Sequence, residues 1–320
     1  MNAALPPLRF AQLHREDDAA LRDELALGLR RQPAEIAPKY FYDTLGSRLF
    51  EAITELPEYY PTRTEAAIFA AHRDEIARAV GRGATLIDLG AGNCAKAASL
   101  FSSLQPERYV AVDIAADFLR ERLQRLQHEH PGIEMNGVGL DFASGLDLPA
   151  WCTAGRPLFF YPGSSIGNFT PAQAKAFLRR VHARAAGGAL LIGVDLVKDT
   201  RRLEAAYDDA LGVTAAFNLN VLRRVNRFIG ADFAPAQWRH VALFDATASR
   251  IEMHLEALSD LTVRWRGGSR NFRAGERIHT ENSYKYTLAG FAALLEEAGF
   301  AAPRFWTDPE AAFAVFHSPA

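Results

Sequence analysis

The chain has 320 residues, of which 49% are hydrophobic and 23% are charged, and its formal net charge is -2. This length and composition are sufficient to bury a large core in one or two domains. Lys plus Arg (36) nearly balances Asp plus Glu (38), and no long run has one sign. These features argue against nucleic acid or a membrane surface as a partner, and we expect a monomer.

The cysteine pattern argues against a secreted, disulfide-rich protein, and the histidine pattern argues against a metal-binding protein. Cys94 and Cys152 form no CxxC pair, and neither a signal peptide nor an apolar run of about 18 residues is recognisable, so we expect a cytoplasmic protein. Nine histidines are present without an H-x-x-x-H or H-E-x-x-H spacing. We therefore expect no metal site.

The first eighty residues predict helices separated by aromatic segments. In chain order these are a loose lead-in over residues 1–15, a helix over Asp17–Leu29, an aromatic patch over Pro38–Asp43, a helix over Gly46–Leu56, an ordered loop over Pro57–Arg63 and a helix from Thr64 to about Val80. The loop is predicted because Pro57 and Pro61 bracket two tyrosines, and proline disfavours a helical residue before it.

The stretch Thr85 to Lys96, TLIDLGAGNCAK, predicts a buried strand, a glycine turn and a helix over Asn93–Leu104. Gly90 and Gly92 let the chain turn tightly and let a ligand approach the backbone beside the free N–H groups of a helix start. The letters also fit the G-x-G-x-x-A fingerprint. The turn alone therefore does not choose between a nicotinamide or flavin cofactor and S-adenosylmethionine (SAM).

Two further acidic strand ends bear on the cofactor. The second strand is expected over Tyr109–Ile114, where Asp113 is placed to accept hydrogen bonds from a ribose, which NAD and SAM both carry. A helix follows over residues 115–129, and a third strand over Met135–Leu140 leads into Asp141 and Phe142. This pair favours SAM, because a carboxylate and an aromatic ring can bind the amino group and the face of adenine.

The parallel pattern continues to residue 198. A fourth strand is expected over Leu158–Tyr161, a helix from Thr170 to about Ala186, and a fifth strand over Ala189–Leu196. The loop Pro162–Phe169 follows the fourth strand and contains Asn168. Because open α/β sheets bind ligands outside the carboxyl ends of their strands, this loop is expected at the ligand site.

The alternation of strand and helix stops after residue 198. The expected elements are one long or two shorter helices over Asp199–Gly230, strands over Arg239–Phe244, Arg250–Leu258 and Leu261–Arg266, an extended segment over Asn271–Ile278, a helix over Leu288–Ala298 and a hairpin from Pro303–Trp306 and Ala312–Phe316. We therefore expect a Rossmann-like α/β sheet domain over 1–198 and 286–320, interrupted by an α+β substrate-binding domain over 199–285.

Three other classes compete with a SAM enzyme at this point. Residues 163–167, GSSIG, fit the letters of the G-x-S-x-G nucleophile elbow. A serine hydrolase is disfavoured because the next helix signal waits until Thr170-Pro171. An NAD-dependent oxidoreductase stays open, as does a SAM-binding module without catalysis, which would lack a polar second pocket.

The segment PKYFYDTLGSRLFEAITELPEYYPTRTE at 38–65 resembles the N-terminal signature of the SAM-dependent L-histidine Nα-methyltransferases of ergothioneine biosynthesis. The similarity extends over nearly the whole chain, including GVTAAFNLNVL at 212–222 and ENSYKYT at 281–287. It implies a class I methyltransferase that transfers three methyl groups from SAM to the α-amine of free L-histidine and gives hercynine. Methylation of another amino acid, such as tryptophan, is the alternative.

The resemblance also implies the residues of the site. Those implied for the cofactor are Gly90, Lys96, Asp113, Asp141 and Phe142, and those for the amino acid are Tyr59, Asn168, Tyr207, Met253, Glu281, Asn282 and Ser283, with Tyr42 and Gly163 as further candidates. Asn168 and Tyr207 are expected to position the amino-acid head group. We assign no general base, because in-line attack of an amine on a sulfonium methyl depends chiefly on placement. Taken singly, Met253 also suits a core position, and Glu281 suits a solvated strand end.

Overall fold

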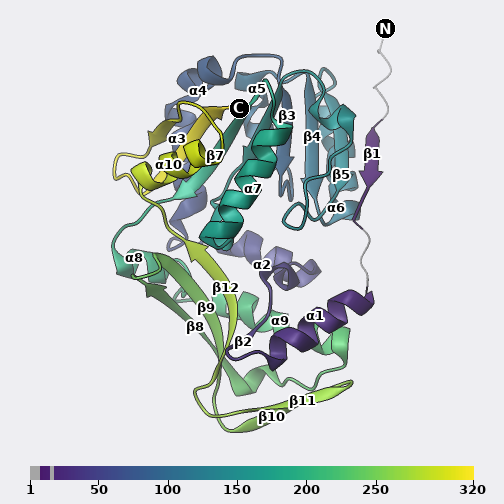
Figure 1. Ribbon diagram of the computed structural model, residues 1–320, viewed down its shortest axis with the longest axis vertical. Coiled ribbons are helices and arrows are strands. Elements are labelled where there is room, and N and C mark those ends of the chain that lie inside the picture. The colour runs from purple at the N-terminus through teal and green to yellow at the C-terminus, as the bar shows by residue number, and fades with distance from the viewer. Residues whose placement is uncertain (1–7, 15–17) are drawn as a thin grey trace.

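The computed structural model describes residues 8–14 and 18–320 and consists of two lobes (Figure 1). The main lobe is built on an eight-stranded sheet, and the second lobe on a four-stranded sheet. In Figure 1 the second lobe lies below the main lobe, and strand β12 (Arg277–Tyr284) runs upward toward the main lobe. Among the described residues, no helix is long and apolar enough to cross a membrane.

The main sheet has the order expected for a Rossmann-like fold. In spatial order its strands are β1 (Arg9–Gln12), β5 (Glu134–Gly139), β4 (Arg108–Asp113), β3 (Thr85–Leu89), β6 (Pro157–Tyr161), β7 (Ala189–Asp195), β14 (Phe313–Pro319) and β13 (Arg304–Thr307). Neighbouring strands are parallel except that β14 is antiparallel to both β7 and β13. Because strand order reverses between β3 and β6, the ligand crevice is expected at their carboxyl ends.

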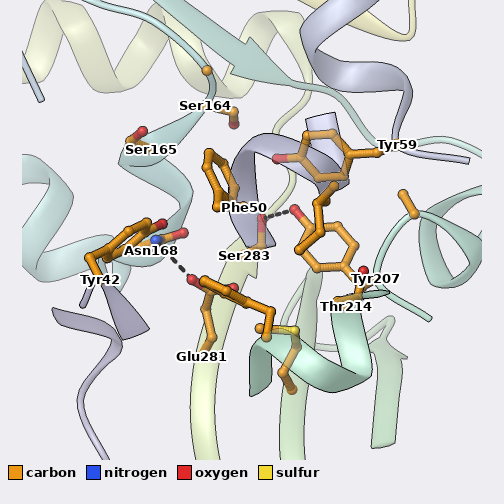
Figure 2. A pocket seen from close by; sticks show the side chains of 15 residues that line it. Tyr42, Phe50, Tyr59, Ser164, Ser165, Asn168, Tyr207, Thr214, Glu281 and Ser283 are labelled. Atoms are coloured by element: carbon orange, nitrogen blue, oxygen red, sulfur yellow. Dashed lines mark hydrogen bonds between the residues drawn. The ribbon is translucent and has the colours of Figure 1, made fainter. Parts of the chain in front are cut away.

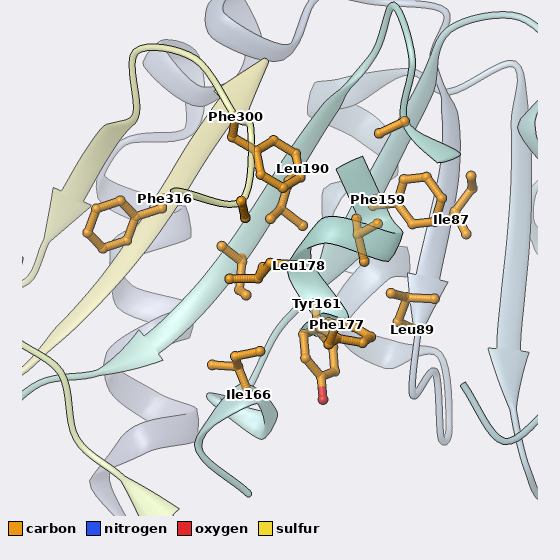
Figure 3. Close-up of a cluster of buried hydrophobic side chains, with 14 of the residues drawn as sticks. Ile87, Leu89, Phe159, Tyr161, Ile166, Phe177, Leu178, Leu190, Phe300 and Phe316 are labelled. Carbon is orange, nitrogen blue, oxygen red and sulfur yellow. The ribbon is translucent and has the colours of Figure 1, made fainter. Parts of the chain in front are cut away.

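Helices cover both faces of the main sheet. One face carries α3 (Tyr60–Ala71), α4 (Arg73–Val80), α5 (Ala95–Leu104) and α6 (Ala116–Glu129), and the other carries α7 (Pro171–Arg184) and α10 (Leu288–Glu297). All five residues of β3 are buried. Strand alternation sends Leu86 to one helical layer and Ile87 to the other, where Phe177 and Leu178 of α7 also pack (Figure 3). Thr170 begins α7 with a capping box, as its sequence predicts.

The second lobe combines the predicted insert with part of the N-terminal segment. Its helices are α1 (Asp18–Arg30), α2 (Thr44–Thr54), α8 (Thr200–Ala205) and α9 (Val213–Ile229), its sheet order is β2 (Ala34–Glu35), β12, β9 (Arg250–Ala257) and β8 (Trp238–Asp245), and β10 (Leu261–Trp265) pairs with β11 (Gly268–Phe272). Short 3₁₀ helices lie at Pro38–Phe41, Ala150–Thr153, Ser165–Asn168 and Pro235–Gln237.

Packing suggests a refinement of the domain boundaries, which remain a prediction. Leu25 and Leu29 of α1 and Phe41 share one hydrophobic cluster with Phe217 and Val221 of α9. We therefore propose that residues 18–56 belong with the insert over 199–285 rather than with the main sheet.

Several expected elements differ from the structure, among them the helix expected from Thr64 to about Val80, which is divided into α3 and α4 at His72. Residues 9–12 form β1 within the predicted lead-in, because pairing with β5 supplies the hydrogen bonds that four local residues do not. Helix α3 begins at Tyr60, inside the predicted loop, since Pro61 occupies the first turn, where its missing N–H costs nothing. The predicted extended segment over 271–278 is divided between β11 and β12 by a turn at Gly275, where φ is +81°.

Phe41 provides a test of this packing. Its side chain is fully buried and stacks on Phe217 with ring centroids 4.6 Å apart. We expect Phe41→Ala to lower the free energy of unfolding by about 3–5 kcal/mol, because it removes buried area and leaves a cavity. Leu45→Ala, at a side chain that is 44% exposed, is the control and should change it by about 0.5 kcal/mol or less. Urea unfolding measures both, and equal effects would contradict the shared core.

Candidate active site

A pocket lies where the two lobes meet, at the carboxyl end of β6 (Figure 2). It holds about 530 Å³ of empty space, including its open mouth. Its lining residues are Tyr42, Phe50, Ile53, Tyr59, Gly163, Ser164, Ser165, Asn168, Ala206, Tyr207, Thr214, Phe217, Met253, Glu281 and Ser283. Eight of these were candidates from the sequence, and they come from segments up to 241 residues apart (Tyr42 to Ser283).

The elements explain how the candidate side chains converge. Tyr59 precedes α3, Asn168 ends the 3₁₀ turn after β6, and Tyr207 follows α8. Glu281 and Ser283 lie two residues apart on β12 and therefore point to the same face. Met253 on β9 is paired directly opposite Glu281.

Asn282 is the amino-acid candidate that the structure does not bring to the pocket. It alternates with Glu281 and Ser283 on β12 and does not line the pocket. Its side-chain oxygen instead lies 2.9 Å from Nε2 of His279. The side chain therefore serves the opposite face of the small sheet.

Two hydrogen-bonded pairs cross the pocket. Asn168 Nδ2 donates to Glu281 Oε1 at 3.2 Å, and the hydroxyls of Tyr207 and Ser283 are 2.7 Å apart. Burial raises the pKa of Glu281 to about 7, although Lys285 and the Asn168 hydrogen bond favour its carboxylate. The pocket thus offers a buried acidic acceptor at one pair and two hydroxyls at the other.

A buried ionic network that the sequence reasoning missed lies behind these hydroxyls. Lys285 Nζ donates to the Asp195 carboxylate at 2.7 Å, to Tyr207 at 2.9 Å and to Ser283 at 2.8 Å. Asp195 also accepts from Tyr60 at 2.7 Å and from Lys198 at 2.5 Å. Lys285 lies within ENSYKYT and Tyr60 within the aromatic signature, but a single sequence does not show which side chains meet.

Aromatic rings form the other wall of the pocket. Phe50 is 5.8 Å from Tyr42, 6.2 Å from Tyr59 and 6.0 Å from Phe217, and Tyr59 is 6.3 Å from Tyr207, all between ring centroids. Phe50 and Phe217 were not among the expected site residues. Their helical positions on α2 and α9 suit core residues equally well, so only the tertiary packing distinguishes them. Such rings favour a cationic or methyl-bearing ligand.

The glycine turn forms at the crevice between β3 and β6. Gly90 and Gly92 have φ of +74° and +51°, which glycine adopts without steric cost. Asp113 accepts from Gly92 N at 2.9 Å and from Ala115 N at 2.9 Å, so its carboxylate holds the turn from the end of β4. Each carboxylate oxygen keeps further acceptor capacity for a ligand hydroxyl.

The remaining cofactor candidates surround this turn. The Phe142 ring lies about 3.6 Å from where a Cβ on Gly90 would stand, and Asp141 accepts from Ala143 N at 3.1 Å. Lys96 Nζ donates at 2.7 Å to Glu65, which also accepts from Gly163 N at 2.7 Å. Glu65 therefore joins the helix behind the glycine turn to the loop that lines the pocket, a link the sequence reasoning did not identify.

A serine hydrolase finds no support at this pocket. Ser165, the third residue of GSSIG, faces the Pro162 carbonyl oxygen at 3.4 Å, and no histidine lines the pocket. Within residues 8–14 and 18–320, no group of three His, Cys, Asp or Glu side chains is arranged to hold a metal ion.

A family model and two relatives of similar sequence indicate one family. A family model described as histidine-specific methyltransferase, SAM-dependent, matches residues 21–319. A histidine N-alpha-methyltransferase of Mycolicibacterium smegmatis is 43% identical over 92% of this chain and 94% of that protein. Another from Mycobacterium tuberculosis is 42% identical over 94% of this chain and 96% of that protein. The solved CcbJ methyltransferase of Streptomyces caelestis is 18% identical, with a TM-score of 0.47 over 87% of this chain and 99% of that chain.

The raised pKa of Glu281 predicts that the free energy of unfolding falls as pH rises. Because the folded protein holds this proton more tightly than the unfolded chain, stability is lost as pH rises from about 4.5 through about 7. Glu281→Gln lacks this titrating carboxyl. As pH rises from 4.5 to 8, we therefore expect its free energy of unfolding to increase by about 2–4 kcal/mol relative to that of the parent. Urea unfolding at both pH values measures this, and a pH-independent difference between the two proteins would contradict it.

Proposed function

Because the chain belongs to the family of histidine-specific, SAM-dependent methyltransferases, we propose that it transfers three methyl groups in succession from SAM to the α-amine of free L-histidine. The product is hercynine, a precursor of ergothioneine. The observation that carries this proposal is the pocket, in which Glu281 and Ser283 face Asn168 and Tyr207 beside the crevice of the main sheet. These four side chains offer hydrogen-bonding groups to both ends of a free amino acid.

The residues around the glycine turn fit SAM. Gly90 and Gly92 leave the backbone open to a ligand, Asp113 offers acceptors to ribose hydroxyls, and Asp141 with Phe142 suits adenine. Lys96 offers a cation to the methionine carboxylate. When bound, SAM supplies an electrophilic methyl group on sulfonium, which forms a C–N bond with the amine lone pair as the C–S bond breaks.

The second pocket positions the amino acid. Asn168 and Tyr207 hold its carboxylate and amine, while Glu281 and Ser283 bind the two nitrogens of the imidazole. Tyr59 lies along the imidazole ring, and Met253 supplies an apolar wall that fits a five-membered ring. The protein's chief contribution is placement of the amine in line with the methyl group, an effect that can supply about 7–11 kcal/mol.

Selectivity for histidine follows from the imidazole partners. Every amino acid presents the same carboxylate and α-amine, so discrimination falls on the side chain. Glu281 is 8% exposed and Ser283 4% exposed, so an apolar side chain would shield both groups from water and offer neither a hydrogen bond beyond those to Asn168, Tyr207 and Lys285. Sites of this kind reject an analogue that lacks the polar groups by about 10⁴–10⁵.

The cofactor assignment predicts a binding selectivity. We expect SAM and S-adenosylhomocysteine to bind and NAD not to bind, with Asp113→Ala weakening SAM by about 1–3 kcal/mol as hydrogen-bonding groups lose their partner. Asp117→Ala, at a fully exposed carboxylate on α6, is the matched control and should leave the affinity unchanged. Calorimetric titration measures each, and heat from NAD without heat from SAM would overturn the assignment.

The substrate assignment predicts mass gains on one amino acid. Incubation with SAM and a panel of free amino acids, followed by mass spectrometry, should give histidine with one, two and three added methyl groups. Glu281→Ala should lower kcat/KM for histidine by about 2–4 kcal/mol, because the imidazole N–H loses its acceptor. A parent enzyme that prefers tryptophan in direct competition, or an unchanged histidine preference in Glu281→Ala, would contradict this account.

A further inference from the structure

Lys285 is a buried cation in contact with the pocket, and the proposed reaction does not yet use it. Its side chain is fully buried, and its ammonium lies within 2.9 Å of the Asp195 carboxylate, the Tyr207 hydroxyl and the Ser283 hydroxyl. An ammonium has three N–H donors and no acceptor. All three donors are therefore engaged, and two of them serve hydroxyls that line the pocket.

The hydrogen-bond count fixes what these hydroxyls offer to a ligand. Each of the two oxygens accepts a bond from Lys285, so neither can point its own proton back at the lysine. Tyr207 and Ser283 are also 2.7 Å apart, and one hydroxyl proton bridges them. The other hydroxyl proton is left to be donated into the pocket. The arrangement thus presents one directed O–H donor backed by a positive charge.

Asp195 keeps this ammonium charged. Burial alone lowers the pKa of Lys285, but the adjacent Asp195 carboxylate outweighs burial and holds that pKa above its usual value. Asp195 itself is 1% exposed, and its own pKa is lowered by Lys285 and Lys198 in spite of burial. The charge behind the two hydroxyls is therefore part of the folded protein at neutral pH.

Resting on the proposed function, we propose that Lys285 is a positioning residue for methyl transfer, which acts through Tyr207 and Ser283. It keeps both hydroxyl protons directed away from itself, so that the one proton not used between Tyr207 and Ser283 is donated to an acceptor atom of the amino acid, and it lends positive charge to the wall that faces the substrate carboxylate. Lys285 does not touch the reacting atoms itself. Its loss lets either hydroxyl proton rotate toward the space that the ammonium occupied, so the amino acid is held in more than one pose.

Lys198 supplies a matched control. It also pairs with Asp195, through the other carboxylate oxygen at 2.5 Å, and it is similarly buried. Its remaining donors go to Tyr60 at 2.7 Å and to the Leu196 carbonyl oxygen, away from the pocket hydroxyls. A purely structural role in neutralising Asp195 would make the two lysines equivalent.

The experiment compares Lys285→Met with Lys198→Met by thermal unfolding, calorimetric titration of SAM and steady-state kinetics. The kinetics use whichever amino acid the parent methylates best. We expect both variants to lose stability, while Lys285→Met alone lowers kcat/KM for the amino acid by about 10- to 100-fold, as misplacement of a substrate does. SAM affinity should stay within about twofold of the parent in both. Equal losses of kcat/KM in the two variants would overturn the proposal.

A second comparison tests the route through the hydroxyls. In a Tyr207→Phe/Ser283→Ala background, Lys285→Met should lower kcat/KM by less than about threefold, because the groups it acts through are gone. An undiminished effect in that background would overturn the proposal. Should Lys285→Met fail to fold, Asp195→Asn/Lys285→Met and its control Asp195→Asn/Lys198→Met remove both charges together and carry the same comparison.

These outcomes separate the inference from the proposed function. A parent enzyme that methylates an amino acid other than histidine contradicts the proposed function, yet the two lysine variants still give a result on that amino acid. If the parent enzyme prefers histidine and the two lysine variants lose kcat/KM equally, the proposed function is upheld and the role of Lys285 is overturned.

Discussion

A buried carboxylate, that of Asp195 at the end of β7, joins three segments of the two lobes. Burying an unpaired carboxylate costs several kcal/mol, so it requires partners with good geometry. They come from the start of α3 (Tyr60), from the segment after β7 (Lys198) and from the segment after β12 (Lys285). The backbone takes part as well, since Asp195 N donates to Ser164 Oγ at 2.8 Å. The N-terminal signature, the main sheet and the second lobe are thereby fixed to the same point.

This junction determines where a ligand pocket can form. The main sheet alone offers a crevice at the carboxyl ends of β3 and β6, which suits a nucleotide-bearing ligand. The second lobe contributes Glu281 and Ser283 of β12 to the pocket beside that crevice, and the loop after β6 supplies Asn168, which donates to Glu281. Glu65 spans the two sites through Lys96 and Gly163. One continuous set of contacts thus links the glycine turn, where we propose that the methyl donor binds, to the pocket proposed for the acceptor.

Local cues allowed much of the fold to be predicted. The strand and glycine turn at 85–92 and the Thr170 cap are set by neighbouring residues, and both occur as expected. Strand β1 and two partners of Asp195, Tyr60 and Lys285, depend on residues more than 80 positions away, so local patterns do not reveal them. The position of the Asn282 side chain outside the pocket could have been predicted in principle, because alternation along a strand places it on the opposite face from Glu281 and Ser283. The turn at Gly275 hid the extent of β12, and with it that alternation.

The composition of the pocket also bears on how one site can act three times on the same atom. Each methylation removes an N–H donor, and the trimethylated product has none, so hydrogen bonds to the amine cannot hold all the intermediates equally. The carboxylate and the imidazole do not change, and the fixed polar groups of the pocket suit those two ends. The amine instead needs a surface that accepts a growing group, permanently charged once it is trimethylated, without hydrogen bonds. The rings of Tyr42, Phe50 and Phe217 have that property, because aromatic faces attract quaternary ammonium groups. Polar anchors at the constant ends and aromatic rings at the changing one therefore let the same geometry serve every step.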